Sequence, residues 1–142
     1  MVCPTPYKTL TALFASHLLF ASLSLQGETI LVSPQGKVKT IREGIARAIA
    51  GDTLLITAGV YRESTLLIDK QLTLVGQDHP VIDGGKQNEI MVITGHGVRV
   101  SGLTLRNGGY SSYQDIAAIR LLNALNAELT GNRIENSFFG IY

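Results

Sequence analysis

Short apolar runs dominate the chain from residue 53 onward. Each run holds three to five residues, mostly Val, Ile, Leu and Thr, and Gly, Asn or Asp stands at its ends. This composition is typical of β-strands joined by tight turns. In residues 98–100 and 103–105 apolar residues alternate with others, and the alternation changes parity at Gly102. A parity change at a glycine predicts a bend after which apolar side chains still point inward.

The apolar pattern also repeats along the chain. Residues 90–107 align with residues 119–136 without a gap, at an offset of 29. Apolar positions coincide in the pairs Ile90 with Ile119, Val92 with Leu121, Ile93 with Leu122, Val98 with Ala127, Val100 with Leu129 and Leu105 with Ile134. Opposite charges coincide in the pairs Arg99 with Glu128 and Arg106 with Glu135. Weaker copies align 72–76 with 98–102 (offset 26), 81–85 with 105–109 (offset 24) and 140–142 with 118–120.

A fixed period with strand-like residues indicates a solenoid. Parallel strands need a crossover connection, yet no helical pattern separates the runs after residue 51. We therefore predict an all-β fold, a right-handed parallel β-helix over residues 53–142, with equivalent strands about 4.8 Å apart. Each Arg–Glu pair would then contribute roughly 0.2–1 kcal/mol and fix the register. Independent hairpins of a β-sandwich remain the alternative, and they predict alternation without charge register.

Polar residues at the turns support the same interpretation. Asp83, Asn107 and Asn136 fall at matching turn positions of successive copies. Side chains of this type tolerate tight backbone geometry and form hydrogen bonds with one another when they are stacked. We expect a column of such side chains along the solenoid axis.

One helix is predicted before the first coil. Residues 40–43 resemble a capping box, in which the Thr40 side chain accepts from the amide of Glu43 and the Glu43 carboxylate accepts from the amide of Thr40. Apolar residues follow at helical spacing, at Ile41, Ile45, Ala48 and Ile49. Gly51 is expected to end the helix. With a strand over residues 28–33, this helix would form an N-terminal unit, residues 26–52, that caps the solenoid core.

The segment 1–25 has the composition of a cleaved export signal. Lys8 supplies its one positive side chain, residues 10–25 are largely apolar, and residues 22–24 offer small side chains for cleavage. A membrane anchor is the alternative, but the apolar run is interrupted and short for a span. Cys3 is the only cysteine, so the mature chain has no thiol for a disulfide or a metal site. We expect a periplasmic protein.

Charge gives little indication of a partner. The chain has a formal net charge of +1, and removing the signal leaves eleven basic and eleven acidic residues. A neutral, mixed surface provides no electrostatic reason to expect nucleic acid or anionic lipid as a partner.

Taken in order, several segments resemble the N-terminal portion of NosD-type proteins, exported β-helix accessory proteins for maturing the copper enzyme nitrous oxide reductase. The matching segments are TIREGIARAIAGDT (40–53), GVYRE (59–63), LIDKQLTLVG (67–76), PVIDGG (80–85), GLTLRN (102–107), NRIEN (132–136) and FGIY (139–142). Each alone is common in β-helix proteins, whereas their order is more specific. Gly44 and Ala50 depart from the family, which more often has Ala and Pro there.

The resemblance implies a scaffold without an enzymatic reaction of its own. Such proteins act with a membrane permease and a cytoplasmic ATPase while the copper centre of the reductase is assembled. The partners would handle copper, so no cofactor is expected in this chain. The family's β-helix is longer, and we expect a truncated solenoid whose last run forms an exposed association edge, with Phe138, Phe139, Ile141 and Tyr142.

Copper ligands are few. After residue 25 the soft or borderline ligands are His79, His96 and Met91. His96 aligns with Lys70 one coil earlier and with Leu125 one coil later, whereas His79 falls in an insertion. This register does not bring the histidines together, so we expect two exposed turn histidines and no metal site.

A sugar-cleaving enzyme is the first alternative function. Residues 59–63 and 95–97 resemble segments of pectin methylesterases and polygalacturonases, which are also β-helices. Acid–base hydrolysis needs two carboxylates roughly 5–9.5 Å apart. The aspartates are expected at turns, at Asp69, Asp78, Asp83 and, beside Gln114, at Asp115. Glu128 and Glu135 are expected to face arginines, which keeps them ionised. We predict no catalytic residue.

A carbohydrate-binding solenoid is the second alternative. It would present a ladder of aromatic side chains for stacking on sugar rings. The candidates do not recur at equal positions: Tyr61, Tyr110, Tyr113 and Tyr142. The longest excursion, loop 108–115, is our candidate contact surface, although an ordinary solvated loop remains open.

Overall fold

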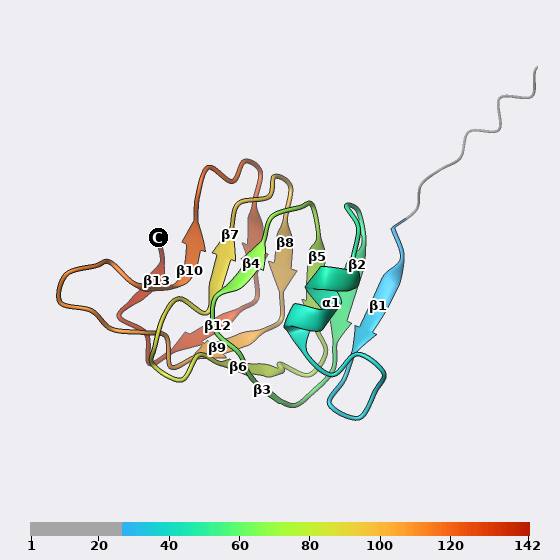
Figure 1. Cartoon of the computed structure of the whole chain (residues 1–142), viewed down its shortest axis with the longest axis horizontal. Helices are drawn as coiled ribbons and strands as arrows, with labels where there is room; N and C mark the ends of the chain where they lie inside the picture. The colour runs from blue at the N-terminus through green and yellow to red at the C-terminus, as the bar shows by residue number, and fades with distance from the viewer. Residues whose placement is uncertain (1–26) are drawn as a thin grey trace, which may run out of the picture.

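The chain winds into a solenoid of parallel strands, and Figure 1 shows the turns following one another along one axis. The computed structural model describes residues 27–142, so the predicted signal over residues 1–25 and Cys3 lie outside the described residues. Each paired strand is parallel to a partner from the next turn. This pairing confirms the predicted parallel β-helix and excludes the sandwich of hairpins.

Three sheets run along the stack. The first sheet contains β1 (Thr29–Val32), β2 (Thr53–Ile56), β5 (Thr73–Gly76), β8 (Arg99–Ser101) and β11 (Glu128–Thr130). The second contains β3 (Val60–Arg62), β6 (Val81–Asp83), β9 (Thr104–Arg106) and β12 (Arg133–Glu135). The third contains β4 (Leu66–Ile68), β7 (Met91–Ile93), β10 (Ala117–Leu121) and β13 (Phe139–Ile141). The predicted strand over residues 28–33 is β1, and it pairs with β2.

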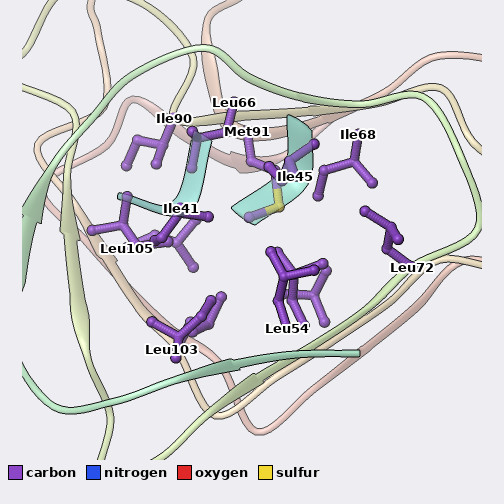
Figure 2. Packing of buried hydrophobic residues seen from close by; sticks show 14 of the residues in the cluster. Ile41, Ile45, Leu54, Leu66, Ile68, Leu72, Ile90, Met91, Leu103 and Leu105 are labelled. Carbon is purple, nitrogen blue, oxygen red and sulfur yellow. The ribbon is translucent and has the colours of Figure 1, made fainter. Parts of the chain in front are cut away.

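The inward side chains of the three sheets meet in one apolar core. Leu54, Leu74 and Val100 stack along the first sheet and have no exposed surface. Figure 2 shows Leu54, Met91 and Leu103 pointing into the same interior. Burying one Leu, Ile or Met side chain contributes about 1.5–3 kcal/mol. Apolar residues that recur at alternate positions therefore hold successive turns together.

In the first sheet the register agrees with the sequence repeat. Arg99 lies opposite Glu128, and Nε of Arg99 donates to Oε2 of Glu128 at 3.1 Å. The offset of 26 between β5 and β8 is also confirmed, because Leu74 lies opposite Val100. The predicted charge pair therefore forms across adjacent turns.

The predicted register of β6 and β9 is wrong by one residue. The sequence alignment places Val81 on Leu105, whereas in the structure Ile82 lies opposite Leu105 and Asp83 opposite Arg106. Ile82 and Leu105 are both fully buried. A one-residue slip would turn Ile82 outward and Val81 inward, so burial of the larger side chain selects the observed register.

The predicted register of β7 and β10 is also wrong by one residue, in the pairs Ile90 with Ile119, Val92 with Leu121 and Ile93 with Leu122. Met91 lies opposite Ile119, and Ile93 opposite Leu121. Met91 and Ile93 are fully buried, so they fix which face of β7 points inward. The next turn absorbs the difference, since six residues connect β10 to β11 and five connect β7 to β8.

The helix α1 (Ile41–Arg47) covers the N-terminal end of the core, where it contacts β1, β2 and β4 (Figure 1). Ile41 and Ile45 are buried, as the helical spacing predicts. Gly44 lies so close to the first sheet that an added Cβ would stand 2.9 Å from side-chain atoms of Leu54 and Val32. Within residues 27–142, no helix has the length and apolar character needed to span a membrane.

Half of the predicted capping box forms. The Glu43 amide donates to Oγ1 of Thr40 at 3.1 Å. The predicted return contact is wrong, because the Glu43 carboxylate accepts from the amide of Lys39 at 3.2 Å. Thr40 is extended, with φ −123° and ψ 150°, and the preceding amide is the one that reaches the carboxylate.

The helix ends earlier than predicted. Its last helical residue is Arg47, and Ala48 is extended, so Gly51 does not terminate the helix. The amide of Ile49 donates to Oδ2 of Asp52 at 2.8 Å, which draws the chain away from the helix axis. Ile49 is therefore 59% exposed instead of joining the apolar face of the helix.

Candidate interaction surface

The predicted column of turn side chains forms around Asp83. Asp83 is the last residue of β6 and so belongs to a strand, not to a turn. Its carboxylate accepts from Nδ2 of Asn107 at 3.0 Å, from the Gly85 amide at 3.1 Å and from Nε of Arg106 at 3.0 Å. Asn107 in turn accepts from Nδ2 of Asn136 at 3.4 Å. The Asn107 hydrogen bond, with Gly85 and Arg106, lowers the pKa of Asp83 despite its partial burial.

The predicted register of Arg106 and Glu135 is confirmed, because the two residues are strand partners, but the predicted contact between their charges does not form. Arg106 lies between Asp83 and Glu135, and its Nε donates to Asp83 instead. The Asp83 side chain is only 15% exposed and is already held by Asn107, so its carboxylate is fixed within reach of the guanidinium.

Other carboxylates also accept hydrogen bonds from backbone amides or arginines of the chain. Glu63, just after β3, accepts from the first two amides of α1 at 2.7 and 2.9 Å. Asp52 accepts from the amides of Glu28 and Ile49, each at 2.8 Å. Three more form ion pairs: Glu43 with Arg47, Glu89 with Arg120 and Glu128 with Arg99. These acids close turns, cap the helix or join adjacent strands.

The three candidate copper ligands lie in different settings. Met91 is fully buried in the core. His96 follows β7, and its Nδ1 accepts from the Leu125 amide at 3.0 Å, which confirms the predicted neighbours one coil apart. His79 lies in the turn between β5 and β6, with φ +50°. Within residues 27–142, no three His, Cys, Asp or Glu side chains gather to hold a metal ion.

Tyr61 belongs to the core. It is 4% exposed, and its hydroxyl donates toward the carbonyl oxygens of Val32 and Thr57, at 3.2 and 3.0 Å. Burial raises the pKa of Tyr61. A single tyrosine in a strand does not reveal its face from sequence alone, and the inward position removes Tyr61 from the candidate surface aromatics.

Loop 108–115 contributes to a continuous group of aromatic side chains. Tyr110 packs edge-to-face on Phe138 with ring centroids 5.1 Å apart, and Phe138 packs on Phe139 at 4.7 Å. Phe139 lies 6.2 Å from Tyr142, over which the Arg120 guanidinium is placed at 5.4 Å. Tyr113 is 97% exposed at the tip of the loop. In Figure 1 this loop projects from the stack between β9 and β10.

A hollow of about 360 Å³ lies where the start of this loop meets the segments that follow β6 and β12. We call it the aromatic hollow, and it is lined by Lys86, Gly108, Gly109, Tyr110, Asn136, Ser137 and Phe138. The two glycines pack too closely for a side chain, because a Cβ on Gly108 would stand 2.7 Å from Oγ of Ser137 and one on Gly109 2.7 Å from the backbone of Gln87. The Gly108 amide donates to Oγ of Ser137 at 3.2 Å, which joins the loop to the last turn.

Loop 108–115 and an exposed Phe138 are both predicted from the sequence, but the hollow between them is not. The repeat offset of 29 supplies a signal that could have found it. Extended by two positions, it places Ser137 over Gly108 and Phe138 over Gly109, and the hydrogen bond between Gly108 and Ser137 agrees with the first of these pairs. Glycines in one turn, followed by residues with side chains at the same places in the next turn, indicate a space at the surface.

No family model, curated protein or solved structure matches this chain.

Proposed function

We propose that this chain is a non-enzymatic, exported β-helix scaffold of the NosD type. It acts with a membrane permease and an ATPase during copper-centre maturation of nitrous oxide reductase. The observation that carries the proposal is that most carboxylates are engaged within the chain. Six of the eleven form hydrogen bonds or ion pairs with other residues of the chain: Asp83, Glu63, Asp52, Glu43, Glu89 and Glu128. Carboxylates that cap the helix and join neighbouring turns are expected in a rigid scaffold.

The histidines fit the same proposal. His96 uses Nδ1 to hold the neighbouring turn, and Met91 packs in the core, so two of the three soft or borderline candidates already serve the fold. A scaffold of this kind leaves copper to its partners. It contributes a stiff surface on which they assemble, and the exposed aromatic group beside loop 108–115 supplies apolar area for such contacts.

The test is restoration of copper loading. In a bacterium that makes nitrous oxide reductase but lacks its own NosD-type gene, expression of the full chain should restore copper in the reductase. Copper per reductase, together with the visible absorption of the purified enzyme, measures the effect. A version without residues 1–25 is the matched control, because it should remain in the cytoplasm and restore nothing. A full chain that is exported and folded but leaves the reductase without copper would refute the proposal.

The carbohydrate alternative is favoured by one observation, the exposed ring of Tyr110 beside a hollow of about 360 Å³. It predicts saturable binding of sugars at this place, independent of any reductase. Titration of the chain with an acidic, Phe-containing peptide and with a galacturonate trisaccharide decides between the two.

A further inference from the structure

The aromatic hollow has the size and walls of an anchor site. Its volume of about 360 Å³ lies within the usual range of small binding pockets, about 300–1,000 Å³. Tyr110 and Phe138 form its aromatic wall and remain 67% and 54% exposed. Exposed aromatic rings in contact with one another are favourable places for an apolar group of a partner to bury itself.

The polar groups that line the hollow are largely engaged within the chain. The Gly108 amide donates to Oγ of Ser137, and the Gly109 amide donates to a backbone carbonyl at 2.9 Å. Nδ2 of Asn136 donates to the turn of the preceding coil at 3.4 Å. A sugar needs partners for many hydroxyls, and unpaired hydroxyls are costly to bury. The lining therefore favours an apolar group over a sugar ring.

Lys86 gives the hollow its charge. It is the one charged residue among those that line the space, and it is exposed. Among residues 27–142 it belongs to none of the ion pairs. An unpaired ammonium at the rim of an apolar hollow complements a carboxylate placed next to an apolar side chain.

We infer that the aromatic hollow anchors a segment of a partner protein in which a Phe, Tyr or Leu stands next to Asp or Glu. The apolar side chain fills the space beside Tyr110 and Phe138, and the carboxylate pairs with Lys86. This inference rests on the proposed function only in requiring a protein partner.

A titration with defined peptides tests the inference. The full chain, exported and labelled with ¹⁵N, is titrated with acetyl-Ser-Asp-Phe-Glu-Ser-amide while the amide signals of Gly108, Gly109 and Ser137 are followed. We expect saturable shifts with a Kd on the order of 1 mM, as for one anchored side chain. The same peptide with Ala in place of Phe should bind at least fivefold more weakly. Equal binding of the two peptides, or tighter binding of a galacturonate trisaccharide, would overturn the inference.

Variants test the two halves of the site. Lys86→Glu should reverse the preference, so that acetyl-Ser-Lys-Phe-Lys-Ser-amide binds better than the acidic peptide. Phe138→Ser should abolish saturable shifts, and Phe138 is exposed enough for the fold to tolerate the change, which circular dichroism checks. Tyr113→Ser is the matched control, because Tyr113 does not line the hollow. An unchanged preference in Lys86→Glu would contradict the charge assignment.

Combining both readouts separates this inference from the proposed function. If Phe138→Ser loses peptide binding and also fails to restore copper, the hollow is the partner contact. If it loses peptide binding yet restores copper fully, the anchor role is refuted and the scaffold proposal stands. If the unmodified chain binds the peptide but restores no copper, the anchor stands and the maturation role is refuted.

Discussion

At the residue scale, polar side chains act on the neighbouring turn of the stack. Asn107 donates to Asp83 on one side and accepts from Asn136 on the other, so one amide ties three turns together. Both asparagines have positive φ, +56° for Asn107 and +50° for Asn136, a region that Asn tolerates better than most residues. The same side chain thus permits the tight turn and satisfies its neighbours.

Asp83 makes stability depend on pH. Its pKa is lowered in the folded chain, chiefly by the Asn107 hydrogen bond, while an unfolded chain protonates this carboxyl near pH 4. Below about pH 4 the unfolded state therefore binds more protons, and the free energy of unfolding falls as the pH drops through the folded pKa. Asp83→Asn should cost about 1–3 kcal/mol at pH 7. The variant should also lose less free energy of unfolding between pH 7 and pH 3 than the unmodified chain, as measured by urea denaturation.

The exposed Asp69, which follows β4, provides the control. Asp69→Asn should leave the free energy of unfolding at pH 7 nearly unchanged, because Asp69 belongs to none of the ion pairs among residues 27–142. A pH profile that is the same in the Asp83→Asn variant as in the unmodified chain would show that Asp83 contributes none of it.

Residue types at matching turns could be predicted from sequence, but their choice of partner could not. The column of Asp83, Asn107 and Asn136 was predicted from the repeat and forms, although Asp83 ends a strand and lies opposite Arg106, one residue before Asn107. Arg106, however, has acids on both neighbouring strands, and only the orientation of Asp83 by Asn107 decides between them. Similarly, Glu63 lies 22 residues from the helix amide that it caps, a contact without a local sequence signal.

At the element scale, the bend between the first and second sheets depends on glycine. Gly102 has φ +69°, and a Cβ there would stand 2.7 Å from the carbonyl oxygen of Gly76 in the preceding turn. Gly131, its equivalent one turn later, has φ +60° with open space around the Cβ position. The two positions share a left-handed conformation that suits glycine, and they differ in crowding.

This difference yields a matched pair of variants. Gly131→Val should cost about 1–2 kcal/mol, because a side chain destabilises the left-handed conformation. Gly102→Val should cost more, because it adds a collision with the backbone of the preceding turn, which cannot rotate away. Urea denaturation of both variants gives the comparison. Equal losses would mean that the turns are not packed as closely as the structure places them.

The strands of the solenoid could be predicted because apolar alternation and the repeat indicate the same elements. The register could be predicted only where no residue is inserted between copies. The turn between β10 and β11 has one residue more than the turn between β7 and β8. An alignment without a gap therefore matches β8 with β11 correctly but places β7 one residue out of register with β10. The end of α1 was missed because Asp52 and Lys70, both outside the helix, satisfy groups at its terminus.

At the scale of the whole molecule, the class of fold follows from repetition, whereas the surface features do not. Each turn needs apolar residues at the same inward positions, so the core residues recur periodically in the sequence. The aromatic hollow arises where periodicity is interrupted by loop 108–115, and its walls come from residues 22 or more positions apart, such as Lys86 and Tyr110. No local pattern marks such a site, and only the repeat offset of 29, extended to residues 137 and 138, points to it in the sequence.

The stack also implies a gradient of local stability. Leu129 and Ile134 are partly exposed, whereas Val100 and Leu105 one turn earlier are fully buried. Because each turn contacts only its neighbours, local opening should require less free energy in β11 and β12 than in β8 and β9. We expect native-state amide hydrogen exchange, followed by mass spectrometry, to be at least tenfold faster in β12 than in β9. The strand β2, covered by α1, should exchange as slowly as β9, and uniform exchange along the stack would show that it opens only as a single unit.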